Sequence, residues 1–251
     1  MCKKRNARRS KSASLLVFPQ YTPSTPPMQP RALLFDFDGV ILDTEWPIYQ
    51  TWLAFFEKHG QQLPLETYIK CIGSDFETWS PEQHFEELTG LKPDWEDFHE
   101  TRNVEIRQEV AKLDIMPGLR DLLTFIQNQK IPCAVVSSSS HSWVDHWLEN
   151  HKLMPFFTKV VCRGDAPRIK PAPDLFVEAC RQLDLPAADC LVIEDSRNGL
   201  IAAHDAGCPV AAIPNRITAC IDFSNAEFQF TDLPGLHEFL RNTVASEESS
   251  P

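Results

Sequence analysis

Two aspartates stand two residues apart where an apolar run of the chain ends. Residues 32–35 predict a short buried strand, and Asp36 and Asp38 follow it directly, before Gly39. Because side chains alternate faces along a strand, we expect both carboxylates to point the same way. Like charges this close cost free energy unless a cation or a shared proton relieves them. The pair therefore predicts a nucleophile and an acid/base beside a hard divalent metal.

Further polar segments follow downstream. The apolar run at 131–136 leads into four consecutive serines, and the run at 190–193 leads into Glu194 and Asp195. Between these two runs, Lys170 lies in a loop stiffened by prolines. In open α/β sheets, sites lie beyond the carboxyl ends of parallel strands, so we expect these groups to converge on one crevice.

Alternating helix and strand patterns predict an α/β fold with a parallel sheet and right-handed crossovers. The expected strands are 32–35, 131–136, 159–162, 190–194 and 209–213. The expected helices of this part are 118–129, 140–150, 174–183 and 197–206. No strand pattern interrupts residues 46–113, where helical spacing at 48–59 and near 64–71, 80–89 and 94–113 predicts a helical insertion.

Together these segments resemble the motif set of the haloacid dehalogenase superfamily, in its phosphatase and β-phosphoglucomutase-like branch. The resemblance covers roughly residues 31–215. It implies a Rossmann-like, doubly wound parallel sheet as the core and an inserted all-α cap domain that closes over the substrate. The domains expected on this basis are a core of residues 30–45 and 115–242 and a cap of residues 46–114.

The resemblance also implies the role of each aspartate of the first pair. Asp36 matches the nucleophile, whose attack on phosphorus forms an aspartyl-phosphate that water then resolves. Asp38 matches the general acid/base, which protonates the leaving oxygen and later activates water. The branch that cleaves carbon–halogen bonds lacks an aspartate at this position. Asp38 therefore favours phosphoryl transfer as the reaction.

Mg²⁺ is the cofactor that the resemblance implies. Its expected ligands are the carboxylates of Asp36 and Asp195 and the backbone carbonyl of Asp38. Glu194 is either a further ligand or a residue that orients the others. Asp195 and Ser196 also suit a helix N-cap, and Ser196 can serve as that cap while Asp195 faces the ion.

Two further segments match the family's phosphate-binding groups. Ser137 matches the hydroxyl that holds a phosphoryl oxygen, with the backbone N–H of Ser138 beside it at the start of a helix. Lys170, in the segment Lys-Pro-Ala-Pro-Asp, matches the cation that balances the nucleophile and the phosphate.

Hydrolysis of a small phosphorylated metabolite, with a sugar phosphate as one candidate, is the leading functional hypothesis. A phosphosugar mutase like β-phosphoglucomutase is the alternative, but that enzyme carries a histidine five residues after the aspartate of its Asp-Thr pair, where this chain has Ile48. A non-catalytic binding protein is a third hypothesis, which the retained catalytic groups disfavour. Specificity is expected from cap residues around 73–75, near Trp79 and His84, and from the loop after Asp43.

The charge of the chain is unevenly distributed. Of a net charge of −11 over 251 residues, the first 29 residues carry six positive charges and no negative one, so the remainder carries about −17. The remainder is therefore not expected to bind nucleic acid. Residues 1–29 predict a disordered basic leader rich in proline, unless translation begins at Met28, and residues 243–251 predict a disordered tail.

The cysteines and the apolar runs indicate in which compartment of the cell the protein is expected. The eight cysteines are scattered and several lie in apolar strand patterns, which favours buried reduced thiols in a cytoplasmic protein. No apolar run reaches the length of a membrane-spanning helix, so no membrane contact is expected.

Overall fold

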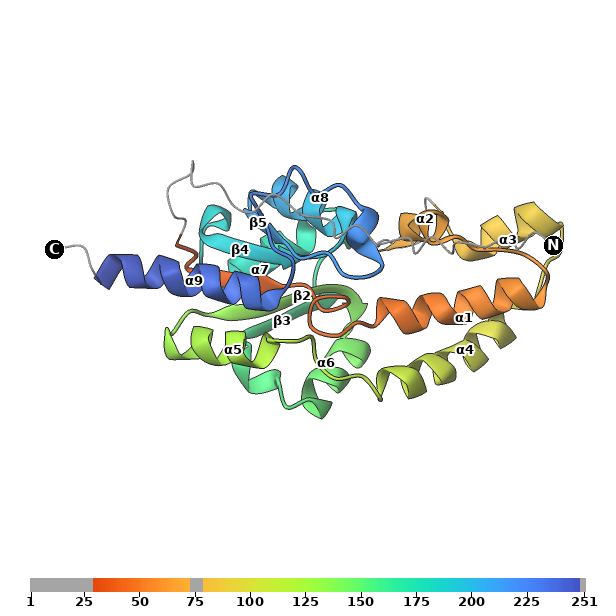
Figure 1. The fold of residues 1–251 in the computed structure, drawn as a ribbon, viewed down its shortest axis with the longest axis horizontal. Coiled ribbons are helices and arrows are strands. Elements are labelled where there is room, and N and C mark those ends of the chain that lie inside the picture. The colour runs from red at the N-terminus through yellow and green to blue at the C-terminus, as the bar shows by residue number, and fades with distance from the viewer. Residues whose placement is uncertain (1–28, 73–78, 249–251) are drawn as a thin grey trace, which may run out of the picture.

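The computed structural model describes residues 29–72 and 79–248 of the chain (Figure 1). Within these ranges the core is a six-stranded sheet in which every paired strand is parallel, with the order β3-β2-β1-β4-β5-β6. The strands are β1 (Ala32–Phe35), β2 (Cys133–Ser140), β3 (Lys159–Arg163), β4 (Cys190–Glu194), β5 (Val210–Ala212) and β6 (Phe228–Gln229). The predicted doubly wound α/β fold is confirmed.

Helices cover both faces of the sheet, because each strand is apolar on both sides. Leu33 and Phe35 of β1 face a layer formed by α5, α6 and α9, whereas Ala32 and Leu34 face α7 and α8. These helices are α5 (Leu119–Asn128), α6 (His141–Asn150), α7 (Asp174–Leu183), α8 (Arg197–Ala206) and α9 (Leu233–Glu248). Short 3₁₀ turns join some of them: η2 (Met154–Phe156), η3 (Ala187–Asp189) and η4 (Thr218–Cys220).

The strand order creates a crevice at one place on the sheet edge. Strands β2 and β3 follow on one side of β1, and β4 then lies on the other side of β1. Phe35 pairs with Ile193 at the carboxyl ends of β1 and β4. The residues that follow these two strands therefore meet where the winding direction changes, which is where open α/β sheets place their sites.

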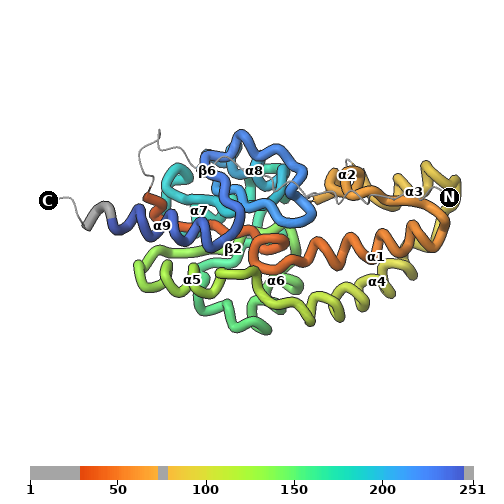
Figure 2. The backbone as a smooth tube through the Cα atoms, viewed as in Figure 1, coloured from red at the N-terminus to blue at the C-terminus, as the bar shows by residue number. Residues whose placement is uncertain are grey.

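The helices that lie between β1 and β2 in the sequence form a separate group, which extends away from the sheet (Figure 2). The long helices α1 and α4 run side by side, and the aromatic side chains of Trp52, Phe56 and Phe85 lie in their own apolar cluster. The elements are α1 (Glu45–Lys58), α2 (Leu65–Tyr68), η1 (Ile69–Cys71), α3 (Pro81–Thr89) and α4 (Trp95–Val110). We propose that they form the cap domain expected at residues 46–114.

The structure corrects two boundaries expected from the sequence. Strand β2 continues through the serines to Ser140, with a register irregularity between Val136 and Ser140, so the helix expected from residue 140 begins at His141. The prediction of a disordered tail from residue 243 was wrong, because α9 continues to Glu248. Its buried Leu236 and Leu240 recur at helical spacing and pack on the core.

Other expectations concern the leader, the cysteines and the membrane. Residues 1–28 and 249–251 lie outside the described part of the chain, so most of the expected leader is not tested. Of the seven cysteines in the described residues, six are buried, as expected, and Cys220 is exposed. Across 29–72 and 79–248, none of the helices combines the length and the apolar content needed to cross a membrane.

Candidate active site

A pocket of about 280 Å³ opens between the carboxyl ends of the central strands and the cap helices. Its lining contains the acids and serines expected from the sequence together with side chains from α1, α4 and η1. The core contributes Asp36, Asp38, Ser137, Ser138, Ser139, Trp143, Arg163, Lys170, Glu194, Asp195 and Ser196, and the cap contributes Glu45, Ile48, Tyr68, Cys71, Ile72, Arg102, Asn103 and Ile106. The residues proposed from the sequence for catalysis, phosphate binding and metal binding therefore share one pocket.

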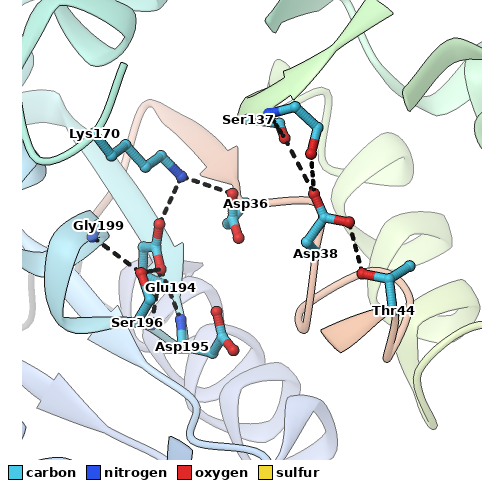
Figure 3. Close-up of polar contacts among 10 residues, drawn as sticks. Asp36, Asp38, Thr44, Ser137, Lys170, Glu194, Asp195, Ser196 and Gly199 are labelled. Carbon is cyan, nitrogen blue, oxygen red and sulfur yellow. Dashed lines mark hydrogen bonds and ion pairs between the residues drawn. The ribbon is translucent and has the colours of Figure 1, made fainter. Parts of the chain in front are cut away.

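Lys170 is a buried cation between two carboxylates (Figure 3). Its Nζ donates to Asp36 Oδ1 and to Glu194 Oε1, both at 2.6 Å. Burial lowers the pKa of Lys170, but the two carboxylates outweigh burial and raise its pKa above the ordinary value. The ammonium therefore stays charged beside the candidate nucleophile.

Negative charge exceeds positive charge in this part of the site. Burial raises the pKa of Asp36 to about 8, even though Lys170 opposes the shift, and Glu194 and Asp38 raise it further. Burial and the charge of Glu194 likewise raise the pKa of Asp195 well above its ordinary range. These three acids, Asp36, Glu194 and Asp195, offer oxygens that lie within 4.8 Å of one another. One lysine does not balance them, so the site favours an additional cation.

Asp195 has an unused oxygen that fits a metal ligand. Asn215 Nδ2 donates to Asp195 Oδ2 at 2.6 Å, whereas Asp195 Oδ1 is buried and has no hydrogen-bond partner among the described residues. Gly39 has a φ of +89°, and a Cβ there would overlap the Asp195 carboxylate. The donor set of carboxylate oxygens suits a hard divalent ion such as Mg²⁺. The side chains expected to bind the metal therefore suit a Mg²⁺ ion.

Glu194 is already occupied by protein donors. Its Oε1 accepts from Lys170, and its Oε2 accepts from the backbone N–H groups of Asp195 and Ser196 at 2.9 Å and from Ser196 Oγ at 3.0 Å. Ser196 Oγ accepts in turn from the N–H of Gly199 at 3.0 Å, which confirms the expected N-cap of α8. Of the two roles left open for Glu194, these contacts favour orientation of Lys170 and of the start of α8.

The carboxylate of Asp38 points toward the serines at the end of β2 (Figure 3). Ser139 Oγ donates to Asp38 Oδ2 at 2.6 Å, and Ser137 Oγ lies 3.5 Å from the same oxygen. On the other side, Thr44 Oγ1 donates to Asp38 Oδ1 at 2.6 Å. Asp36 and Asp38 therefore face the same pocket in different surroundings, one against a lysine and one among hydroxyls.

The serine segment differs from the expected helix start. Ser137 is buried within β2, and its Oγ accepts from the N–H of Ser139 at 3.0 Å. Ser138 Oγ is buried with no partner among the described residues, and Arg163 Nε donates to the carbonyl of Ser138 at 3.0 Å. Both serines line the pocket, but they lie before α6 rather than in its first turn.

Apart from Ile48, the residues on the cap side of the pocket were not singled out from the sequence. Burial raises the pKa of Glu45, the first residue of α1, to about 8, and the charges of Asp38 and Asp36 add to that rise. Arg102 of α4 is only 9% exposed, and its Nε donates to Thr51 Oγ1 at 2.8 Å. A carboxyl group and a guanidinium group thus face the space above the two aspartates.

The expected specificity residues are only partly tested. Residues 73–75 lie outside the described part of the chain. Trp79 and His84 are not among the residues that line the pocket, and their rings contact each other within the cap at a tilt of 43°, with centroids 5.6 Å apart. Both rings belong to the aromatic contacts of the cap, and their expected part in specificity stays a prediction.

Other residues of the site also escaped the sequence analysis. Glu45 directly follows the Asp-Thr pair, which was a usable signal. Asn215, Arg102 and Trp143 carried no signal, since each is an isolated polar or aromatic residue brought to the site only by folding.

The chain matches the family model described as "Haloacid dehalogenase-like hydrolase" over residues 33–213. It is 32% identical over 203 residues to a protein of Bacillus subtilis (strain 168) named "Putative phosphatase YhcW", and the match covers 81% of this chain and 92% of that protein. It is also 32% identical over 192 residues to a Drosophila melanogaster protein named "Probable pseudouridine-5'-phosphatase", covering 72% of this chain and 80% of that protein.

Solved structures share the fold at lower identity. CbbY from Rhodobacter sphaeroides, determined in complex with phosphate, superposes with a TM-score of 0.65 at 23% identity, covering 82% of this chain and 96% of that chain. A predicted phosphoglycolate phosphatase from Haemophilus somnus 129pt gives a TM-score of 0.69 at 19% identity, with coverage of 87% and 98%. The chain therefore belongs to the haloacid dehalogenase-like hydrolase family, in its phosphatase branch.

Proposed function

We propose that this protein hydrolyses a small phosphorylated metabolite, with Mg²⁺ as cofactor and an aspartyl-phosphate as intermediate. The observation that carries the proposal is the convergence of Asp36, Asp38 and Lys170 on one pocket. Among the described residues, Lys170 donates a hydrogen bond to Oδ1 of the Asp36 carboxylate. This contact leaves Oδ2 available to attack phosphorus.

Each residue of the chain has a distinct part in this reaction. Attack by Asp36 forms the bond to phosphorus, while Asp38 protonates the leaving oxygen and then takes a proton from the attacking water. Lys170 holds the nucleophile and offsets the charge of the phosphoryl group, and Ser137 and Ser138 hold its oxygens. Asp36, Asp195 and the backbone carbonyl of Asp38 would bind the metal ion. When bound, the ion supplies positive charge that neutralises the phosphate.

Hydrolysis is favoured over transfer to a sugar by the apolar residue at one position of the pocket. Ile48 of α1 lines the pocket where a mutase of this branch carries a histidine. An aliphatic side chain takes no proton from a sugar hydroxyl, so water is the better acceptor of the phosphoryl group. The relatives from Bacillus subtilis and Drosophila melanogaster, both named as phosphatases, support the same choice.

The test is release of inorganic phosphate from a panel of phosphorylated metabolites with Mg²⁺. We expect at least one small phosphomonoester to be hydrolysed, without formation of an isomeric phosphate ester. Asp36→Asn should abolish the release while leaving the fold intact by circular dichroism, and Glu109→Gln, at an exposed acid of α4, serves as the matched control. Absence of phosphate release from every ester would refute the proposal, and wild-type turnover by Asp36→Asn would remove Asp36 as the nucleophile.

A further inference from the structure

The indole of Trp143 contacts the candidate general acid. Trp143 lies in the first turn of α6, and its Nε1 donates to Asp38 Oδ1 at 3.0 Å. The ring lines the pocket between the serine segment and the cap. An aromatic side chain 105 residues downstream of Asp38 therefore reaches one of the two carboxylate oxygens.

Each oxygen of Asp38 has its own set of partners. Oδ1 accepts from Thr44 Oγ1 and from Trp143, whereas Oδ2 faces Ser139 Oγ at 2.6 Å and Ser137 Oγ at 3.5 Å. Figure 3 shows Thr44 on one side of the Asp38 carboxylate and Ser137 on the other. Oδ2 is thus the oxygen on the side of the residues proposed to hold the phosphoryl group.

The donors differ in what they do when Asp38 carries a proton. A hydroxyl group both donates and accepts, so Thr44, Ser137 and Ser139 can each turn to accept a proton from the carboxyl group. An indole N–H only donates. A carbonyl-type oxygen is a better acceptor than a protonated one, so the N–H of Trp143 favours the state in which Oδ1 is unprotonated and the proton is on Oδ2.

Building on the proposed function, we propose that Trp143 is a positioning residue that directs the proton of Asp38 to Oδ2, beside the phosphoryl site. In the first step the Asp36 Oδ2–P bond forms as the bond from phosphorus to the ester oxygen breaks. The proton passes from Asp38 Oδ2 to that ester oxygen, the alcohol leaves, and Asp38 remains as a carboxylate. Without the indole N–H, most of the population carries the proton on Oδ1, toward Thr44, where it does not reach the leaving group.

Neighbours on two elements hold the indole ring. The ring of Trp147, one turn along α6, packs against it at a centroid distance of 5.6 Å and an interplanar angle of 80°. The guanidinium of Arg107, from the cap helix α4, lies 5.5 Å from the centre of the Trp143 ring. The ring is therefore fixed by contacts that do not involve its N–H group, so that group can be removed separately.

The test compares phosphate esters whose leaving groups need different amounts of protonation. With Mg²⁺, kcat/KM would be measured for p-nitrophenyl phosphate, phenyl phosphate and glycerol 2-phosphate, because kcat/KM reports the step in which the leaving group departs. Trp143→Phe should lower kcat/KM about tenfold for glycerol 2-phosphate, a part of the roughly 10²–10⁴-fold of general-acid catalysis. The same variant should change kcat/KM less than about twofold for p-nitrophenyl phosphate, whose leaving group departs without a proton.

Trp147→Phe is the matched control. The Nε1 atom of Trp147 is buried and has no hydrogen-bond partner within the described residues, so its removal should leave the ratio between esters unchanged.

The outcomes separate this inference from the proposed function. An equal loss on all three esters by Trp143→Phe, or the same ester dependence in Trp147→Phe, would overturn the positioning role while leaving the phosphatase proposal in place. Absence of phosphate release from every ester by the wild type would refute both proposals. A selective loss on glycerol 2-phosphate in Trp143→Phe alone would establish the role of the indole N–H.

Discussion

Asp195 is an acid that is both buried and close to other acids, an arrangement that costs free energy unless a cation is bound. Its side chain is buried and its Oδ1 has no partner among the described residues, yet its carboxylate lies in a group of three acids. Burial and the charge of Glu194 raise its pKa, which means that the ionised form is destabilised in the folded protein without an ion. The same group becomes a ligand once a divalent ion is bound.

This opposition predicts effects of opposite sign for Asp195→Asn. Without metal, the variant should unfold at a higher temperature than the wild type at neutral pH, because it lacks the buried charge. At a concentration 100 times its Kd, Mg²⁺ should add about 2.7 kcal/mol to the free energy of unfolding of the wild type and so raise its thermal midpoint. Mg²⁺ should not raise the thermal midpoint of Asp195→Asn. Thermal melts with EDTA or Mg²⁺ measure both effects, with the exposed Asp121→Asn as control. An equal Mg²⁺ shift in wild type and Asp195→Asn would exclude Asp195 as a ligand.

The start of helix α8 holds Glu194, which in turn holds Lys170 against Asp36. Glu194 Oε2 accepts three donors at this helix start, and Glu194 Oε1 holds Lys170 against Asp36. Gly199 allows the arrangement, because a Cβ at this position would overlap the carboxyl group of Glu194. The close approach of helix and strand therefore fixes a lysine that lies on a different loop.

Gly199→Ala should consequently impair both stability and activity. We expect a loss of about 1–3 kcal/mol in the free energy of unfolding from the forced overlap, and a fall in kcat because Glu194 and Lys170 are displaced. Urea unfolding and phosphate release measure the two effects. Gly235→Ala, in the first turn of α9, is the matched control, since a Cβ there meets Asp232 Oδ1 at an ordinary 3.4 Å. Unchanged activity in Gly199→Ala would show that the Glu194 contact is not needed.

Helix α6 is tied to the loop after β3 by a histidine. His141 Nε2 lies 2.7 Å from Asp165, and Nδ1 lies 3.1 Å from Asp145. Partial burial lowers the pKa of His141, but the hydrogen bonds to the two aspartates outweigh burial and hold its pKa above the ordinary value of 6.5. The protonated form is therefore the one that the fold favours.

This raised pKa predicts a pH dependence of stability. The contribution of His141 is fully present below the pKa of the unfolded chain and is lost as the pH rises through the higher pKa of the folded protein. Urea midpoints of the wild type should therefore show a component that falls as the pH rises above about 6.5, and His141→Gln should remove that component. His146→Gln on the same helix, at a residue whose ring contacts Asn150, is the control. A decline in His141→Gln equal to that of the wild type would contradict the assignment.

The whole molecule consists of a sheet with two helical layers and a set of helices that projects over its carboxyl edge (Figure 1). Both parts contribute to one pocket, so the site is complete only when the cap helices lie against the core. A direct link between them is the amide of Asn198 in α8, whose Nδ2 donates to the carbonyl of Ile72 at 2.8 Å.

Asn198→Ala should weaken the approach of the cap to the core. A hydrogen bond of this kind contributes about 1 kcal/mol net, so we expect KM to rise about fivefold while the free energy of unfolding changes little, since the helices of the two parts keep their own cores. Steady-state kinetics on a hydrolysed ester and urea unfolding measure the two quantities. Gln182→Ala removes an amide that bonds only within α7 and is the control. An unchanged KM would show that this contact does not hold the cap in place.

Much of the fold followed from local pattern. Apolar runs ending in polar residues predicted the strands that carry the site, and the strand order places those strand ends together. The end of β2 was missed, and α9 was not predicted at all. Serine suits both strand and turn, and an amphipathic helix near a chain end is stabilised by the core on which it packs rather than by its own residues.

The sequence by itself determined that acids, serines and one lysine would gather beyond the ends of parallel strands, because the covalent order of motifs and the right-handed crossover leave few other arrangements. It also indicated the phosphatase branch through Asp38. Only the tertiary structure decided what each group contacts: Asn215 orients Asp195, Glu194 is taken up by Lys170 and α8, and Trp143 donates to Asp38. Such contacts join residues separated by up to 105 positions, and their distances depend on how whole helices pack, which no local pattern encodes.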